Sequence, residues 1–161
     1  MIIQKASVYF AESYCKAVDT IARERKYLGS TTGFPVESTI DFVGLIVRNN
    51  WPQYYAIEDG EVVGWCDAIP KSYEGLTHVS VLGMGVLAPF RGKGLGSQLL
   101  EKIIEHSRNN GIEKIELDVY ESNQAAIGLY EKFGFFSEGS RINGRKLDGV
   151  YDHIKQMGKF L

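Results

Sequence analysis

The residues with the clearest chemical potential form a glycine-rich turn just before a helical pattern. They are Arg91, Gly92, Lys93, Gly94, Leu95, Gly96 and Ser97. The start of a helix leaves about four backbone N–H groups without partners inside the helix and carries about half a positive charge. Glycines let the backbone close on the oxygens of an anion without a Cβ in the way. The turn therefore predicts a phosphate site.

The charge pattern supports an anion site at this turn. No Asp or Glu occurs from Gly75 to Leu100, whereas Arg91 and Lys93 lie in the turn itself. The whole chain of 161 residues carries a formal charge of -2, which argues against nucleic-acid binding through bulk positive charge.

Two common phosphate motifs do not fit these residues. A nucleotide P-loop needs Gly-Lys followed by Ser or Thr, but Lys93 is followed by Gly94. A dinucleotide fingerprint read from Gly83 runs into Pro89, where no helix is predicted to begin. The pattern Arg-x-x-Gly-x-Gly after a valine-rich strand instead resembles the acetyl-CoA pyrophosphate loop of the GNAT N-acetyltransferase superfamily.

A second motif strengthens the resemblance. Asn123, Ala126, Tyr130, Gly134 and Phe135 match the Asn-x-x-Ala-x-x-x-Tyr-x-x-x-Gly-Phe signature of that superfamily. The interval from Gly96 to Asn123 accommodates one helix and one strand. The resemblance covers roughly residues 77–138 and is weak in the first 50 residues.

The elements that must position these motifs follow from hydrophobic periodicity. Apolar spacing predicts helices over 10–28, from 35–38 to 48, over 94–110 and over 123–132. Alternating patterns and turn residues predict strands over 53–58, 62–69, 77–87 and 115–119, and two more within 135–161. In the second helix, Val36, Ile40, Val43 and Val47 are expected to face inward. The element order is β-α-α-β-β-β-α-β-α-β-β.

Several turn residues mark the ends of these elements. Asp59-Gly60 predicts a hairpin, and Gly111 and Gly134 are expected to end the helices before them. Ser122 or Asn123 can cap the helix that follows. Asn143-Gly144 and Asp148-Gly149 separate the two last strands.

The resemblance implies an α/β (α+β) fold with a mixed, mostly antiparallel sheet of about seven strands and flanking helices. The helix between strands 77–87 and 115–119 predicts that they run parallel, and the resemblance implies that they splay apart. Residues 1–161 are expected to form one domain. Within it, 8–50 supply acceptor-side helices, 77–138 the CoA-binding core and 135–161 a C-terminal hairpin.

The resemblance also implies roles for individual residues. The strand segment Met84, Gly85 and Val86 would hydrogen-bond the pantetheine arm, with the Val86 N–H also polarising the thioester carbonyl. The turn 91–97 would wrap the pyrophosphate. Asn123 and Ala126 would line the CoA path, and Tyr130 would protonate the departing thiolate. No metal is expected, since the three histidines lie far apart.

The general base is the open question of this sequence. The positions of strand 77–87 that often hold a Glu or His base in the superfamily are occupied by Ser80 and Leu82. Asp67, His78 and Glu37 remain as candidates, and Asp67 is the one paired with Tyr130 in the predicted catalytic set. His106 and His153 are expected at the surface.

The function implied is transfer of an acetyl group from acetyl-CoA to the primary amine of a small molecule, by direct attack in a ternary complex. Residues 141–152 resemble small-molecule and peptide-end acetyltransferases of bacteria. Two alternatives stay open, namely a protein or peptide amine as acceptor and a non-catalytic acyl-CoA-binding module.

Composition suggests the cellular setting. The cysteines Cys15 and Cys66 are too few for a disulfide framework and predict a reducing compartment. The longest apolar run is far shorter than the ~20 residues that cross a bilayer, and residues 1–4 lack a basic leader. A cytoplasmic protein without a membrane partner is expected. Proteins of this superfamily often dimerise, and the C-terminal strands would offer an edge for a homodimer.

Overall fold

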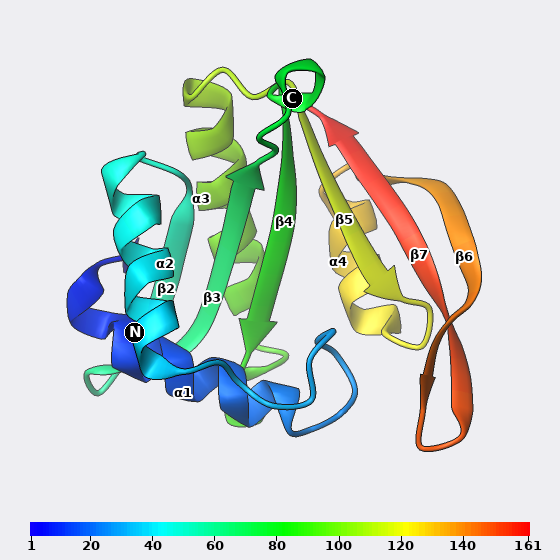
Figure 1. The fold of residues 1–161 in the computed structure, drawn as a ribbon, viewed down its shortest axis with the longest axis horizontal. Coiled ribbons are helices and arrows are strands. Elements are labelled where there is room, and N and C mark those ends of the chain that lie inside the picture. The colour runs from blue at the N-terminus through cyan, green and yellow to red at the C-terminus, as the bar shows by residue number, and fades with distance from the viewer.

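The computed structural model describes all 161 residues and contains one seven-stranded sheet with four α-helices (Figure 1). The strands are β1 (Ile2–Lys5), β2 (Gln53–Glu58), β3 (Glu61–Pro70), β4 (Val79–Val86), β5 (Lys114–Tyr120), β6 (Phe136–Leu147) and β7 (Val150–Phe160). The helices are α1 (Ala11–Ala22), α2 (Val36–Arg48), α3 (Leu95–Asn109) and α4 (Gln124–Lys132). The predicted element order and mixed sheet are confirmed.

The helices form a layer on each face of the sheet. In Figure 1, α1 and α2 lie in front of the sheet, and α3 and α4 lie behind it. Each layer buries its own core, of ten residues under α1 and α2 and of eighteen under α3 and α4. The apolar stripe predicted for α3 is buried in full, and it consists of Leu95, Leu99, Leu100, Ile103 and Ile104.

The strand order is β1-β2-β3-β4-β5-β7-β6, and every neighbouring pair is antiparallel except β4 and β5. That parallel pairing joins only residues 79–81 to residues 114–116. Beyond this point β4 pairs with β3 alone, and β5 pairs with β7 alone. The predicted parallel pair and its splay are therefore confirmed.

The free edge of β4 carries backbone groups without a strand partner. The amide of Lys71 donates to the carbonyl of Val79, and the amide of Leu87 donates to that of Val63. Because every second residue of an antiparallel strand bonds to a given neighbour, the odd-numbered residues of β4 form their backbone hydrogen bonds with β3. The N–H and C=O groups of Met84 and Val86 consequently point toward the gap, where the C=O of Val86 accepts a hydrogen bond from Nε of Arg91 at 2.8 Å.

Local signals account for several helix ends. Gly111 has φ +78°, and hydrogen bonds from Gly111 to Arg108 and from Ile112 to Ser107 form a Schellman motif after α3. The side chain of Asn123 accepts a hydrogen bond from the Ala126 amide at 3.2 Å and so caps α4. Both predicted caps are confirmed.

Three predictions about elements are wrong. The helix predicted to continue to residue 28 ends at Ala22, because the chain turns at Arg25, whose φ is +59°. In α2, Val36 and Val47 are exposed, whereas Thr39 and Ile46 are buried with the expected Val43. Asn143-Gly144 does not separate the last strands but lies in an irregular stretch within β6, and Asp148-Gly149 alone forms the hairpin turn.

None of the four helices is both long enough and apolar enough to span a bilayer.

The close contact between Gly85 and Trp65 yields a stability prediction. A Cβ at Gly85 would lie 2.5 Å from Cη2 of Trp65, whose ring is buried against Tyr14. Gly85→Ala should therefore lower the free energy of unfolding by about 1–3 kcal/mol, the usual cost of overpacking. Urea denaturation measures the change. Gly75→Ala is the matched control because nothing lies within 4 Å of its Cβ position, and an equal loss in both variants would contradict the packing argument.

Candidate functional site

The glycine-rich turn presents six backbone amides without a protein acceptor. These amides belong to Gly92, Lys93, Gly94, Leu95, Gly96 and Ser97, and the first bond of α3 is the one that Gln98 donates to Gly94. Gly92 and Gly94 have φ values of +72° and +81°, a conformation that favours glycine. A row of free donors at the start of a helix is an arrangement that binds phosphate oxygens.

The side chain of Arg91 does not extend freely from this turn. Its guanidinium forms a bidentate ion pair with Glu24 at 2.9 and 2.7 Å, and its Nε donates to the carbonyl of Val86 at 2.8 Å. It also lies 4.7 Å from the ring centre of Tyr27. Hydrogen bonding to Glu24 raises the pKa of Arg91. Arg91 therefore joins the end of α1 to the end of β4, whereas Lys93 has no carboxylate partner.

Residues 75–100 contain no Asp or Glu, but the turn still has an acidic neighbour, because Glu24 pairs with Arg91. Glu24 reaches the turn from a segment 67 positions away in sequence, and no local spacing could reveal it.

The second motif lies under the opening between β4 and β5. Tyr130 on α4 is buried in the core shared by Leu82 and Val119, with its ring 5.7 Å from that of Phe135. Burial raises the pKa of Tyr130 above its ordinary value of 10.0, and the Cys66 thiol adds to the shift. The phenol is therefore protonated at neutral pH and able to donate a proton.

The remaining members of the predicted set divide by role. Asn123 uses its side-chain oxygen as the α4 cap, and Ala126 packs half-buried against the core one helical turn before Tyr130. Met84 and Val86 lie on the free edge of β4, and Gly85 faces Trp65.

Asp67 is a buried carboxyl on the α1 and α2 side of β3. Its side chain accepts a hydrogen bond from Nε2 of Gln53 at 3.2 Å. Burial raises the pKa of Asp67 from 3.8 to about 7, and the Gln53 hydrogen bond offsets part of that rise. A Cβ at Gly83 would lie 3.3 Å from Oδ1 of Asp67, so the carboxyl occupies space that a β4 side chain would otherwise fill.

A polar chain behind Asp67 was not predicted from the sequence. The hydroxyl of Tyr55 donates to Oε1 of Gln53 at 3.0 Å, and Gln53 then donates to Asp67. All three side chains are buried. The sequence signal that could have revealed it is Gln53, a polar residue at the start of the largely apolar strand β2, because a buried polar group needs hydrogen-bond partners.

The structure separates the three candidate bases. Asp67 lies beside β4, His78 is exposed at the end of β4 farthest from the turn 91–97, and Glu37 is exposed in the first turn of α2. The positions Ser80 and Leu82 are buried on the α3 side. The residue of β4 that faces Asp67 is instead Gly83.

The segment after α1 also contacts the C-terminal hairpin. Arg25 forms a bidentate ion pair with Asp148 at 3.1 and 2.8 Å, and Arg145 donates to the carbonyls of Arg25 and Lys26. The guanidinium of Arg145 lies 4.2 Å from the ring centre of Tyr120 at the end of β5. The loop is therefore held at the β4 end by Glu24 and at the β5 end by these contacts.

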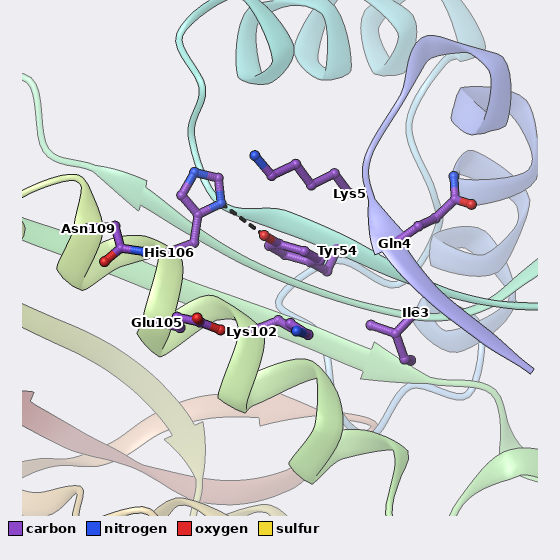
Figure 2. A pocket seen from close by; sticks show the side chains of 8 residues that line it. All are labelled: Ile3, Gln4, Lys5, Tyr54, Lys102, Glu105, His106 and Asn109. Atoms are coloured by element: carbon purple, nitrogen blue, oxygen red, sulfur yellow. Dashed lines mark hydrogen bonds between the residues drawn. The ribbon is translucent and has the colours of Figure 1, made fainter.

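Two cavities lie away from the β4 edge. A polar cavity of about 420 Å³ separates β1 and β2 from α3, and Figure 2 shows its side chains, namely Ile3, Gln4, Lys5, Tyr54, Lys102, Glu105, His106 and Asn109. His106 was expected at the surface but is buried, and its Nδ1 lies 3.3 Å from the Tyr54 hydroxyl. Burial lowers the pKa of His106, and the nearby Lys5 adds to the effect.

The second cavity, of about 330 Å³, lies between α1 and α2. It is lined mainly by apolar side chains. No group of three or more His, Cys, Asp or Glu side chains is close enough together to hold a metal ion.

Comparison with known proteins agrees with this architecture. A model of the acetyltransferase (GNAT) family matches residues 17–135. The chain is 32% identical over 105 residues to the L-amino acid N-acetyltransferase AaaT of Escherichia coli, with 62% of this chain and 65% of that protein covered. It is 30% identical over 120 residues to an L-methionine sulfoximine/L-methionine sulfone acetyltransferase of Pseudomonas paraeruginosa, with 70% of each covered.

The fold likeness extends over the whole chain. An acetyltransferase of the GNAT family from Streptococcus pneumoniae has a TM-score of 0.93 at 26% identity, and the match covers 99% of both chains. The sequence matches are shorter, since the chain spans 54 to 65% of the length of four curated relatives.

The buried carboxyl of Asp67 yields a prediction about stability and pH. Above about pH 4 the unfolded chain loses this proton, while the folded chain retains it until about pH 7. The raised pKa therefore lowers the free energy of unfolding across that window. Asp67→Asn keeps an acceptor for Gln53 and removes the charge, so it should be more stable than the parent at pH 8 by on the order of 2–4 kcal/mol.

Urea denaturation at about pH 4 and pH 8 tests this expectation. The gain should fall to well below its pH 8 value at the lower pH, where the folded carboxyl is protonated and the unfolded one is only partly ionised. Asp41→Asn is the control, because Asp41 is exposed on α2 and forms no ion pair. A gain that is equal at both pH values would contradict the buried, raised-pKa carboxyl.

Proposed function

The chain belongs to the GNAT family of acetyltransferases, and from this premise we propose that it transfers an acetyl group from acetyl-CoA to the primary amine of a small molecule. Residues 1–161 act as one catalytic domain in this proposal. The observation that carries it is the row of six unpaired amides, 92–97, at the end of a strand whose own edge is unpaired. The two features together suit a ligand with a diphosphate at one end and amides along its length.

The diphosphate of the coenzyme binds the amides of residues 92–97, with Lys93 as the nearby cation. Six N–H donors and the start of α3 supply directed bonds to phosphate oxygens. Arg91 contributes through its backbone and through its contacts with Glu24 and Val86, which hold the turn against β4.

The pantetheine arm pairs with β4 as a strand would. Amides of the arm exchange hydrogen bonds with Met84 and bond to the free N–H of Val86, whose C=O already accepts from Arg91. Asn123 and Ala126 line the other side. The N–H of Val86 polarises the thioester carbonyl as the amine attacks.

Asp67 and Tyr130 perform the proton transfers. With a pKa of about 7, Asp67 is ionised in part at neutral pH and accepts the proton that the amine loses, directly or through a water. The amine attacks the thioester carbon within the ternary complex, where proximity supplies much of the rate. The C–S bond then breaks, and the buried phenol of Tyr130 protonates the departing thiolate.

A buried phenol on α4 and a buried carboxyl on β3, on opposite faces of the sheet, favour an enzyme over a binding module. Burying a carboxyl that ionises near neutral pH lowers the stability of the fold. A module that only bound acyl-CoA would gain nothing in return for that loss at Asp67. Small-molecule amines are the favoured acceptors because acetyltransferases for L-amino acids and for L-methionine sulfoximine are among the relatives of the chain.

Thiol release from acetyl-CoA over a panel of primary amines tests the transfer. The parent protein should show turnover whose kcat/KM rises with pH through about 7, because Asp67 must be ionised to act as base. Asp67→Asn should lower kcat at least tenfold and abolish the rise of kcat/KM with pH. Tyr130→Phe should lower kcat with little change in KM.

Each outcome of that assay bears on a different part of the proposal. Absence of thiol release with every amine, alongside micromolar CoA binding, would favour the non-catalytic module. A Tyr130→Phe variant with unchanged kcat would remove Tyr130 as the acid, and an unchanged pH limb in Asp67→Asn would remove Asp67 as the base.

The phosphate turn is tested by a matched pair of variants at Gly94. Gly94 has φ +81° and nothing lies within 4 Å of its Cβ position, so Asp and Asn fit equally well there. The two side chains have nearly the same shape, and only Asp adds a like charge beside the diphosphate. CoA affinity, measured by calorimetry, should be at least about tenfold weaker in Gly94→Asp than in Gly94→Asn. Equal affinities would contradict diphosphate binding at this turn.

A further inference from the structure

Backbone pairing joins the two halves of the sheet at one end of the gap only. Strands β1 to β4 form one half and β5 to β7 form the other, and the halves pair through residues 79–81 and 114–116. Behind the sheet, the core under α3 and α4 contains residues of both halves. In front, the core under α1 and α2 contains no residue of β5, β6 or β7. On this face, the width of the gap at its open end therefore depends on contacts outside the core.

The loop that follows α1 supplies such contacts through two consecutive residues of opposite charge. Glu24 pairs with Arg91, in the turn after β4, at 2.9 and 2.7 Å. Arg25 pairs with Asp148, in the turn between β6 and β7, at 3.1 and 2.8 Å. Figure 1 shows this blue loop between the arrowhead of β4 and the β6–β7 hairpin. Neighbouring residues of one loop thus attach to opposite sides of the gap.

The backbone of this loop is also fixed from the far side of the gap. Arg145 donates to the carbonyl of Arg25 at 2.8 Å and to that of Lys26 at 3.3 Å. Its guanidinium lies 4.2 Å from the ring centre of Tyr120 on β5. Arg25 has φ +59°, a left-handed conformation that costs a non-glycine residue free energy and persists where the surroundings impose it. The contacts with the hairpin therefore hold a strained turn in place.

These charged contacts form a network rather than separate surface pairs. An isolated ion pair at a protein surface adds little to stability, whereas bidentate pairs that share one short segment fix its geometry. Hydrogen bonding to Arg25 lowers the pKa of Asp148, and hydrogen bonding to Glu24 raises the pKa of Arg91. Each pair therefore favours the charged form of its partners in the folded chain.

We propose that residues 24–26 form an ionic tie that sets the width of the gap between β4 and β5, so that coenzyme binding along β4 and the position of the β6–β7 hairpin depend on each other. The inference rests on the proposed coenzyme site and extends it to residues outside β4, the phosphate turn and α4. Glu24, Arg25 and Asp148 are positioning residues in it, because they act on the coenzyme through Arg91 and the hairpin.

Hydrogen-bond geometry makes the width of the gap matter. In the proposed site the coenzyme bonds to the edge of β4 and also contacts the start of α4, so it touches both sides of the gap at once. Donor–acceptor distances vary by only a few tenths of an ångström around about 2.9 Å. A wider gap therefore loses contacts on one side, and the affinity for the coenzyme falls. Linkage requires the converse, that coenzyme binding stabilises the tie by the same factor.

Coenzyme affinity of variants on the hairpin side of the tie tests the coupling. Asp148→Asn and Arg25→Asn each remove one charge of the pair, and asparagine tolerates the left-handed conformation that both positions adopt. Each variant should bind CoA at least about threefold more weakly by calorimetry, and the double variant should be no weaker than either single variant. Arg23→Gln is the matched control, because Arg23 pairs with Asp19 of α1 instead. Unchanged affinity in both asparagine variants would overturn the inference.

Hydrogen exchange of the hairpin, followed by mass spectrometry, gives the reciprocal readout. CoA should slow the exchange of amides 141–151 severalfold in the parent and much less in Asp148→Asn, although the proposed coenzyme site includes none of these residues. A role of Asp148 in hairpin stability alone would change the exchange rate but not its response to CoA. An equal response in the two proteins would therefore count against the tie.

Glu24→Gln measures the tie without any ligand. Glu24 forms its ion pair with Arg91 and none with the hairpin, yet its loss should speed the exchange of amides 141–151 severalfold. Glu12→Gln, at an exposed position of α1, should not. If CoA fails to bind the parent, the proposed function fails, and this pair of variants decides the tie: unchanged exchange overturns it. If CoA binds and no variant alters affinity or exchange, the tie fails and the proposed function stands.

Discussion

The backbone of β4 beyond residue 81 lacks a strand on its β5 side, because β4 and β5 diverge there. β3 pairs with β4 along its whole length, and β7 pairs with β5 to its last residue. Each strand therefore keeps a full ladder on its far edge, while the edges that face the gap stay without a strand partner. Because an unsatisfied buried backbone group costs about 1–3 kcal/mol, the edge of β4 must be satisfied by water or by a ligand that carries amides.

The same strand also positions the other parts of the site. β4 leads through a short turn directly into residues 91–97, so the free amides lie at the end of the unpaired edge. Gly83 and Gly85 have no side chains on the α1 and α2 side, and Asp67 and the Trp65 ring from β3 fill that space. The carboxyl of Asp67 on β3 thereby lies beside β4, which has no acidic residue of its own.

Signals within one element were readable from the sequence, and contacts between distant segments were not. The stripe of α3 and the caps at Gly111 and Asn123 depend on spacings of a few residues, which sequence periodicity records directly. The pairs Glu24 with Arg91 and Gln53 with Asp67 depend on how α1 and β2 pack. The first helix was extended too far for a related reason, since apolar spacing continues through Leu28 although the backbone turns at Arg25.

The buried chain from Tyr55 through Gln53 to Asp67 explains how one carboxyl serves both states of the proposed reaction. In the free protein, burial keeps Asp67 protonated at a pH where most carboxyls are ionised. An ammonium group bound beside Gly83 favours the charged carboxylate and lowers that pKa. In the proposed reaction the substrate would thus ionise its own base on arrival, and Gln53 would hold the carboxylate in place as the ammonium proton moves to it. That proton transfer would neutralise both groups together and would leave a neutral amine beside the thioester, with no net charge in the apolar surroundings.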